Sequence, residues 1–299
     1  MPSLAEARAS NAAFKPSYPP VAVFVGGTSG IGQGMAEVFA RHTGGNAHIV
    51  IVGRDKAKAD AIISSLPKSS TSTYEFVPCD VSLMKNVRAC TDSLAQRLPK
   101  INFLVLSAGV FTTQGRTETE EGLDQKLALH LYSRWKLTEG MLPLLQKAKK
   151  DGEDAKVMSV LDSVYGGPID LDDIDLKKEY SLRAAANTAT TGNDIMVVEY
   201  ARRHPEIAFM HTAPGFVNTP ILSRNHPILG SLLSPLGSLF GTKPQDCAEW
   251  MLYPLLSKAF GQGGFHLDNH AEPSKPNRYV TEESKLKVYE HVLEFTKVK

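Results

Sequence analysis

The sequence predicts an α/β protein built on one doubly wound, mainly parallel sheet. Short apolar runs alternate with longer helical patterns, the runs are apolar at nearly every position, and a glycine-rich turn follows the first of them. Such alternation is typical of right-handed strand–helix–strand units. Runs without polar alternation are expected where helices cover both faces of a sheet.

Strands are expected where short β-rich runs occur, at Val21–Val25, His48–Val52, Tyr74–Val77, Phe103–Leu106, Lys156–Leu161 and Ile207–His211. Helices are expected between them, at Gly30–Arg41, Lys56–Leu66, Leu83–Leu98, Leu123–Gln146 and Asn193–Arg203. The pattern then loosens, and the sequence predicts a helix over Pro244–Leu256, a strand over Gly264–Leu267 and a helix over Glu282–Thr296. We therefore expect one domain over residues 21–299 after an N-terminal extension of residues 1–20. A substrate-facing loop is expected at about 213–242, with its apolar part, Ile221–Phe240, over a hydrophobic pocket.

Composition excludes several classes of protein. The 299 residues include 33 Lys and Arg against 32 Asp and Glu, for a net charge of +1, which argues against a nucleic-acid binder. Three cysteines without a CxxC pair predict neither a disulfide framework nor a metal site. The chain has no signal-like start and no apolar segment of roughly 18 residues, so we expect a cytoplasmic protein without a transmembrane segment.

The glycine-rich turn is the strongest functional signal. Gly26, Gly30 and Gly32 lie where the first expected strand passes into the first expected helix. Glycines let the backbone turn sharply and approach a pyrophosphate, and the helix N-terminus then offers free N–H donors. A glycine turn without a ligand is the alternative. The position of this turn within a strand–helix series favours dinucleotide binding.

This turn resembles the TGxxxGxG loop of the short-chain dehydrogenase/reductase family, with Val25 where the threonine usually stands. Cys79-Asp80-Val81 resembles the family motif after the third strand, and Leu106–Gly109 takes the place of its NNAG stretch. Pro214–Thr219 is similar to its PGxVxT segment. From about residue 20 onward, the order of elements is similar to the retinol-dehydrogenase-like and secondary-metabolite branches. The resemblance implies a Rossmann-type fold.

The resemblance also implies which residues bind the cofactor. Asp80 would cap the adenine amine, and Pro214–Thr219 would cover the nicotinamide carboxamide. The residues implied in cofactor binding are Gly26, Thr28, Ser29, Gly30, Ile31, Gly32, Arg54, Asp80, Val81, Ser107, Ala108, Gly109, Pro214, Gly215, Val217 and Thr219.

The choice of cofactor depends on the residues after the second expected strand. An arginine there favours the 2′-phosphate of NADP, whereas a carboxylate favours the ribose hydroxyls of NAD. Arg54, with Thr28 and Ser29 as further donors, favours NADP. The adjacent Asp55 keeps NAD open, although it also suits the N-cap of the next helix.

Catalysis is where the sequence departs from the family. Family members use a serine after the fifth strand and a YxxxK pair on the next helix. Ser163 fits the serine position, with Asp162 beside it, although a simple turn residue is the alternative. The family pattern places Ala186 at the tyrosine and Thr190 at the lysine, and neither can replace them.

Other side chains could replace the missing acid. His130 stands where the family has an asparagine, and a histidine could donate a proton near neutral pH, although a packing role is the alternative. The literal YxxxK at Tyr132 and Lys136 comes before Ser163, and we interpret it as coincidental. Tyr165, Tyr180 or a water could also supply the proton.

These observations predict an NADP-dependent reductase that acts on a carbonyl or imine of a hydrophobic small molecule. The secondary-metabolite resemblance suggests a biosynthetic tailoring step. An iminium substrate would need no proton donor. The alternatives are a non-redox cyclase or isomerase and a cofactor-binding protein without catalysis. The resemblance also implies a homodimer through the helices at Leu123–Gln146 and Asn193–Arg203, with Trp135 either on that surface or in the core.

Overall fold

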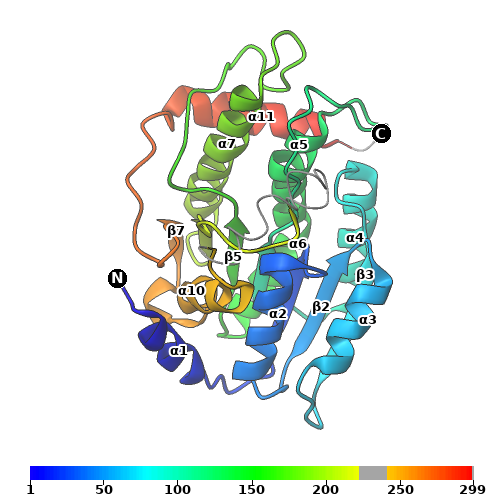
Figure 1. The fold of residues 1–299 in the computed structure, drawn as a ribbon, viewed down its shortest axis with the longest axis vertical. Coiled ribbons are helices and arrows are strands. Elements are labelled where there is room, and N and C mark those ends of the chain that lie inside the picture. Colours follow the sequence, from blue (N-terminus) through cyan, green and yellow to red (C-terminus); the bar gives the residue numbers. More distant parts are fainter. Residues whose placement is uncertain (222–240, 298–299) are drawn as a thin grey trace.

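The computed structural model describes residues 1–221 and 241–297, and it contains one seven-stranded parallel sheet. The strand order is β3-β2-β1-β4-β5-β6-β7, so the chain moves outward from β1 in both directions (Figure 1). The strands are β1 (Val21–Val25), β2 (His48–Gly53), β3 (Thr73–Pro78), β4 (Phe103–Leu106), β5 (Lys156–Val160), β6 (Ala208–Thr212) and β7 (Gly263–Leu267). This architecture confirms the doubly wound α/β fold that the sequence predicts.

Helices cover both faces of the sheet, as the uniformly apolar strands require. The helices are α1 (Leu4–Ala12), α2 (Gly30–His42), α3 (Lys56–Ser65), α4 (Met84–Arg97), α5 (Gln125–Leu127), the π-helix η1 (Ala128–Tyr132), α6 (Ser133–Lys150), α7 (Leu182–Arg203), α10 (Pro244–Leu256), the 3-10 helix η2 (Lys258–Phe260) and α11 (Glu282–Phe295). One buried cluster packs α4, α6, α7 and α11 against one face, and a second packs α2, α3 and α10 against the other. Alternate residues of β1 enter the two clusters, as the pleat dictates.

Two helical segments differ from the sequence prediction. The helix expected over Leu123–Gln146 is divided, because the backbone forms the π-helix η1 between α5 and α6. Helix α7 begins at Leu182 rather than at the expected Asn193. Ser181 caps this start, because its side chain accepts a hydrogen bond from the backbone N–H of Ala184. Its first turns contain mainly alanine and threonine, so they lack the large apolar residues that signal helical periodicity.

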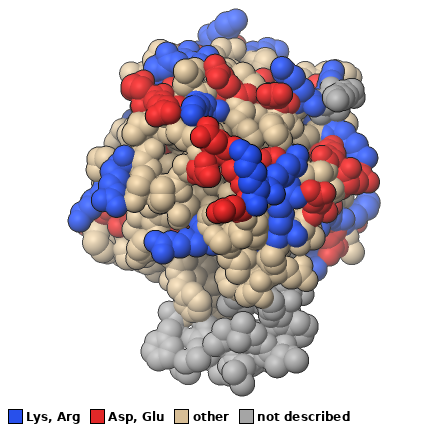
Figure 2. Space-filling view, turned by 90° about the horizontal axis from the view of Figure 1, so that it is seen from above, with Lys and Arg blue, Asp and Glu red and all other residues tan. Residues whose placement is uncertain are grey.

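The loop expected at 213–242 falls partly outside the described residues, because positions 222–240 are not described. Within the described ranges, no helix combines the length and hydrophobicity that a membrane crossing requires. Figure 2 views the end of the molecule that carries α11, where basic and acidic side chains interleave. Lys287, for example, lies 3.4 Å from both Asp172 and Glu283.

Helix α1 was not expected from the sequence, and it packs against α10 at the buried carboxylate of Glu249. The side-chain amide of Asn11 donates to Oε2 of this carboxylate at 2.9 Å, and His42 Nε2 lies 2.9 Å from the same oxygen. Burial alone would raise the pKa of Glu249, but the hydrogen bonds from His42 and Asn11, with the charges of His42 and Arg41, lower it overall. The carboxylate therefore joins the N-terminal segment to the domain.

We expect Glu249→Gln to lower the free energy of unfolding at pH 7 by about 1–3 kcal/mol, because buried partners lose an ionised acceptor. A carboxyl group with a lowered pKa stabilises the folded state above its unfolded pKa of about 4.3, and this contribution disappears as the pH falls through the folded value. Urea unfolding at pH 7 and at stepwise lower pH measures the difference. The exposed Glu290→Gln is the control, and an equal loss at every pH would contradict the electrostatic explanation.

Candidate functional site

The turn between β1 and α2 brings backbone donors to the centre of the sheet edge. Gly26 and Gly30 adopt positive φ angles of 83° and 59°, which L side chains rarely adopt. Ser29 occupies the N-cap of α2, but its side chain makes no capping hydrogen bond. The first N–H groups of α2 therefore have no side-chain cap from Ser29. The positive end of the helix dipole lies at the same turn as these N–H groups.

This turn lies so close to the end of β4 that side chains would not fit. A Cβ atom on Gly26 would lie 2.6 Å from the backbone nitrogen of Ala108. A Cβ atom on Gly32 would overlap Ser107 Oγ and lie 2.6 Å from the Gly26 carbonyl oxygen. Ser107 Oγ itself donates to the Val25 carbonyl oxygen at 2.9 Å, which holds the two strand ends together. The glycines thus keep open a shallow backbone cradle.

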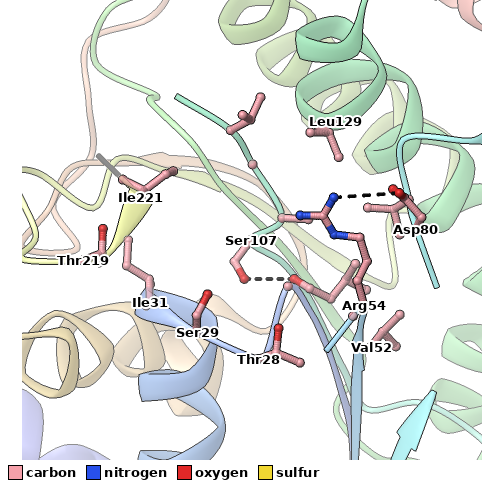
Figure 3. Close-up of a pocket in the computed structure, with 18 of the residues that line it drawn as sticks. Thr28, Ser29, Ile31, Val52, Arg54, Asp80, Ser107, Leu129, Thr219 and Ile221 are labelled. Atoms are coloured by element: carbon pink, nitrogen blue, oxygen red, sulfur yellow. Dashed lines mark hydrogen bonds and ion pairs between the residues drawn. The ribbon is translucent and has the colours of Figure 1, made fainter. Parts of the chain in front are cut away.

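A cavity of about 470 Å³ lies over this cradle. It is formed at the carboxyl ends of β1, β2, β3 and β4, where open parallel sheets bind their ligands. Figure 3 shows its wall, with Thr28 and Ser29 below, Arg54 and Asp80 at one end and Thr219 and Ile221 at the other. The sequence-predicted binding residues in the lining are Gly26, Thr28, Ser29, Gly30, Ile31, Arg54, Asp80, Val81, Ser107, Ala108, Gly109 and Thr219.

Four predicted binding residues lie outside this lining: Gly32, Pro214, Gly215 and Val217. Gly32 belongs to the first turn of α2 behind the cradle. The Pro214–Thr219 segment reaches the lining only at Thr219, and the Asn218 N–H donates to the Thr242 carbonyl oxygen at 2.9 Å. A Cβ atom on Gly30 would lie 3.3 Å from the Thr219 side chain, so this segment comes close to the cradle at Thr219.

Arg54 and Asp55 have different surroundings after β2. The Arg54 side chain is 71% exposed, and its guanidinium lies 3.8 Å from Asp80 at the cavity mouth. The Asp55 carboxylate accepts from the backbone N–H of Lys58 at 3.0 Å and pairs with the Lys58 ammonium at 2.7 Å. These contacts favour the helix-capping interpretation of Asp55 that the sequence left open, whereas Arg54 faces the cavity.

The predicted catalytic residues after β5 are turned toward the protein. Ser163 is 4% exposed and its hydroxyl donates to the carbonyl oxygen of Leu267 in β7. One carboxylate oxygen of Asp162 accepts from the backbone N–H groups of Val164 and Tyr165, at 3.2 and 3.3 Å. Neither Ser163 nor Asp162 lines the cavity. The sequence could not show this, because Leu267 is far along the chain.

His130 lies in η1 and is partly buried. Its Nε2 accepts a hydrogen bond from the Val110 N–H at 3.0 Å, and a Cβ atom on Gly109 would lie 2.9 Å from the same nitrogen. Burial, with the charges of Arg134 and Lys126, lowers the pKa of His130 to about 3. The ring is therefore neutral at pH 7 and serves as an acceptor, which favours the packing alternative over a proton donor.

The two residues of the literal YxxxK have separate partners in the structure. The Tyr132 hydroxyl lies 2.8 Å from His291 Nε2, and Lys136 donates to Glu139 at 3.0 Å. Neither residue lines the cavity. Trp135 is buried, with its indole N–H donating to the Gly192 carbonyl at 3.2 Å, so the core interpretation applies to it.

Helix α7 is continuous through the positions where the family pattern places the tyrosine and lysine. Ala186 is exposed and Thr190 is buried, one turn apart on the same helix. The structure also reveals a residue that the sequence analysis missed, the buried Arg134 in α6. The sequence signal for Arg134 is an arginine within an apolar helical stretch. A helical pattern places such an arginine on the solvent-facing side of the helix, so its burial was not predicted.

Comparisons with known proteins agree on one family. The family profile described as short chain dehydrogenase matches residues 20–168. Oxidoreductase AN1596 of Emericella nidulans is 32% identical over 92% of this chain and 79% of that protein. Human polyprenol dehydrogenase is 26% identical over 91% of this chain and 84% of its own length. An alcohol dehydrogenase from the archaeon Thermococcus sibiricus, complexed with 5-hydroxy-NADP, has the same fold with a TM-score of 0.62 and 17% identity, covering 86% and 99% of the two chains.

We expect Gly32→Ala to lower the free energy of unfolding by about 1–3 kcal/mol, because the added methyl group overpacks against Ser107 and Gly26. Thermal and urea unfolding measure the change. Gly115→Ala is the matched control, since a Cβ atom there has no neighbour within 4 Å. Equal stability of the two variants would show that the cradle is looser than its geometry indicates.

Proposed function

Because the chain belongs to the short-chain dehydrogenase/reductase family, a family of oxidoreductases, we propose that it is an NADP-dependent reductase of a carbonyl or imine on a hydrophobic small molecule. The observation that carries this proposal is the glycine cradle beneath a cavity of about 470 Å³, with Arg54 at its mouth. The close packing of the turn on the end of β4, which a Cβ atom at Gly26 or Gly32 would prevent, fits the glycine turn of a dinucleotide-binding fold.

The proposed cofactor would be held along the whole cavity. The backbone of Gly26 to Gly32 and the hydroxyls of Thr28 and Ser29 would hold the phosphates. Asp80 and Val81 would contact the adenine, and Ser107, Ala108 and Gly109 would form the wall above β4. Pro214, Gly215, Val217 and Thr219 would cover the nicotinamide end. When bound, NADPH supplies a hydride, and the protein supplies orientation and electrostatics.

Exposed apolar side chains support a hydrophobic substrate. Phe111 is 44% exposed after β4, Tyr165 is 76% exposed after β5, and Phe216 is 57% exposed after β6. All three follow the carboxyl ends of neighbouring strands, on the same edge of the sheet as the cavity. Large apolar groups exposed together are typical of a ligand-binding surface. The resemblance of the sequence to the secondary-metabolite branch of the family extends the proposal to a tailoring step in such a pathway.

The two proposed substrate classes, carbonyl and imine compounds, differ in whether they need a proton donor. His130 is neutral and accepts a hydrogen bond, and Ser163 can polarise a substrate only if its hydroxyl releases the Leu267 carbonyl. A ketone would then take its proton from water or another group, whereas an iminium carbon needs no donor. Ser163, Asp162 and His130 thus remain candidates for the reacting centre with distinct constraints. A homodimer through α6 and α7 remains part of the proposal.

We expect Arg54→Ala to weaken NADPH binding by roughly 10–100-fold and to leave NADH binding unchanged, because a charge-assisted bond to the 2′-phosphate is lost. Calorimetric titration of both cofactors measures this. Lys56→Ala, which removes a nearby cation paired with Asp60, is the control. Tighter binding of NADH than NADPH by the unaltered protein would exclude the role of Arg54.

Turnover tests the activity itself. Incubation with NADPH and a panel of hydrophobic ketones, aldehydes and cyclic imines should oxidise NADPH in proportion to product. Parallel reactions without cofactor are the control. Product formed without cofactor would point to non-redox catalysis, and tight binding without any turnover would point to a protein that only binds.

A further inference from the structure

Arg134 is a buried cation beneath the wall of the cavity. It lies in α6, is 2% exposed, and donates to three acceptors from its two terminal nitrogens. One nitrogen bonds Ser159 Oγ at 2.6 Å and the Val160 carbonyl at 2.9 Å, and the other bonds the Ala108 carbonyl at 3.0 Å. The guanidinium therefore joins the ends of β4 and β5, directly behind a cavity-lining residue.

Within the described residues, the charge of Arg134 is not paired directly with a carboxylate. All three acceptors are neutral, and within the described ranges no carboxylate lies within 4.0 Å of the guanidinium. Its Nε is buried without a hydrogen-bond partner there. Burial lowers the pKa of Arg134 to about 9, so the group is still protonated at pH 7. A buried charge of this kind acts over a longer distance than an exposed one, because little water screens it.

The charge of Arg134 affects the neighbouring His130. His130 is held beside Gly109 in the cavity wall, and after burial the charge of Arg134 is the next cause of its lowered pKa. Lys126 contributes in the same direction, but it lies 3.9 Å from Asp124, which offsets part of its charge. The buried charge of Arg134 therefore lies directly behind the Ala108–Gly109 end of the cavity, on its α6 side.

We propose that Arg134 is a fixed cation that makes this cavity bind the reduced nicotinamide cofactor more tightly than the oxidised one. The inference rests on the proposed function. Oxidised nicotinamide carries a positive ring charge that the reduced ring lacks, so a nearby buried cation destabilises only the oxidised complex. The same bias weakens binding of the oxidised cofactor that remains after hydride transfer and so favours its release, while it makes hydride donation from the bound reduced cofactor less favourable.

Two carboxylates near the same strand ends act in the opposite sense. Asp194 in α7 is engaged by His211 Nδ1 at 2.7 Å and by the Asn277 amide at 2.7 Å. Asp162 lies two residues beyond Val160, and its carboxylate accepts hydrogen bonds from the backbone N–H groups of Val164 and Tyr165. Neutralising Asp162 should therefore change the balance between the two cofactor forms in the direction opposite to neutralising Arg134.

The test measures the dissociation constants of NADPH and NADP⁺ by calorimetry for the unaltered protein and its variants. Arg134→Met should lower the preference for NADPH about tenfold, whereas Arg134→Lys, which keeps the charge, should retain it. Ser159→Ala removes a partner of Arg134 without removing the charge, so it should leave the preference unchanged. An equal loss of affinity for both forms in Arg134→Met would assign Arg134 a purely structural role and overturn the proposal.

Further variants keep the test decisive. If Arg134→Met does not fold, Arg134→Gln replaces it as the neutral variant. If neither folds, the unaltered protein carries the test: tighter binding of NADPH than of NADP⁺ supports the proposal, and equal affinity for the two forms overturns it. Failure of the unaltered protein to bind either form would instead overturn the proposed function, so the two failures are distinguishable.

Discussion

The close approach of the β1–α2 turn to the end of β4 is the constraint on which the rest of the site depends. The turn after β1 meets the segment after β4, the strand at which the second half of the sheet begins. Only glycine at positions 26 and 32 permits this contact. The contact leaves the α2 N-terminus open and places the ends of four strands around one cavity. Stability of the sheet and formation of the cradle therefore depend on the same residues.

The two halves of the site differ in the functional groups that they present. Its phosphate-facing half has the glycines, hydroxyls and exposed cation that a dinucleotide requires, whereas the half near β5 and α7 lacks the tyrosine and lysine usual in the family. A buried polar network occupies that half, in which Ser159 bonds Asn193 at 2.6 Å and Asn193 bonds the His130 carbonyl at 2.7 Å. Satisfied buried polar groups of this kind fix the geometry of the core, but they present few protons to a ligand.

The sequence was most informative where local chemistry alone determines structure. The bounds of β1 and β4 match the predicted runs, and α2 follows the glycine turn, since apolar runs and glycines act within a few residues. It was least informative where contacts join distant segments. The bond of Ser163 to Leu267, the acceptor role of His130 toward Val110 and the burial of Arg134 depend on tertiary packing, which no local pattern encodes. The long alanine- and threonine-rich start of α7 was missed for a related reason, because small residues give a weak periodic signal.

A crystal structure of the protein soaked with NADPH tests the central claim most directly. The account predicts density for a dinucleotide in the cavity, with its pyrophosphate on the backbone of Gly26 to Ile31 and its 2′-phosphate beside Arg54. A cavity that stays empty at saturating NADPH, or a dinucleotide bound elsewhere on the protein, would contradict it.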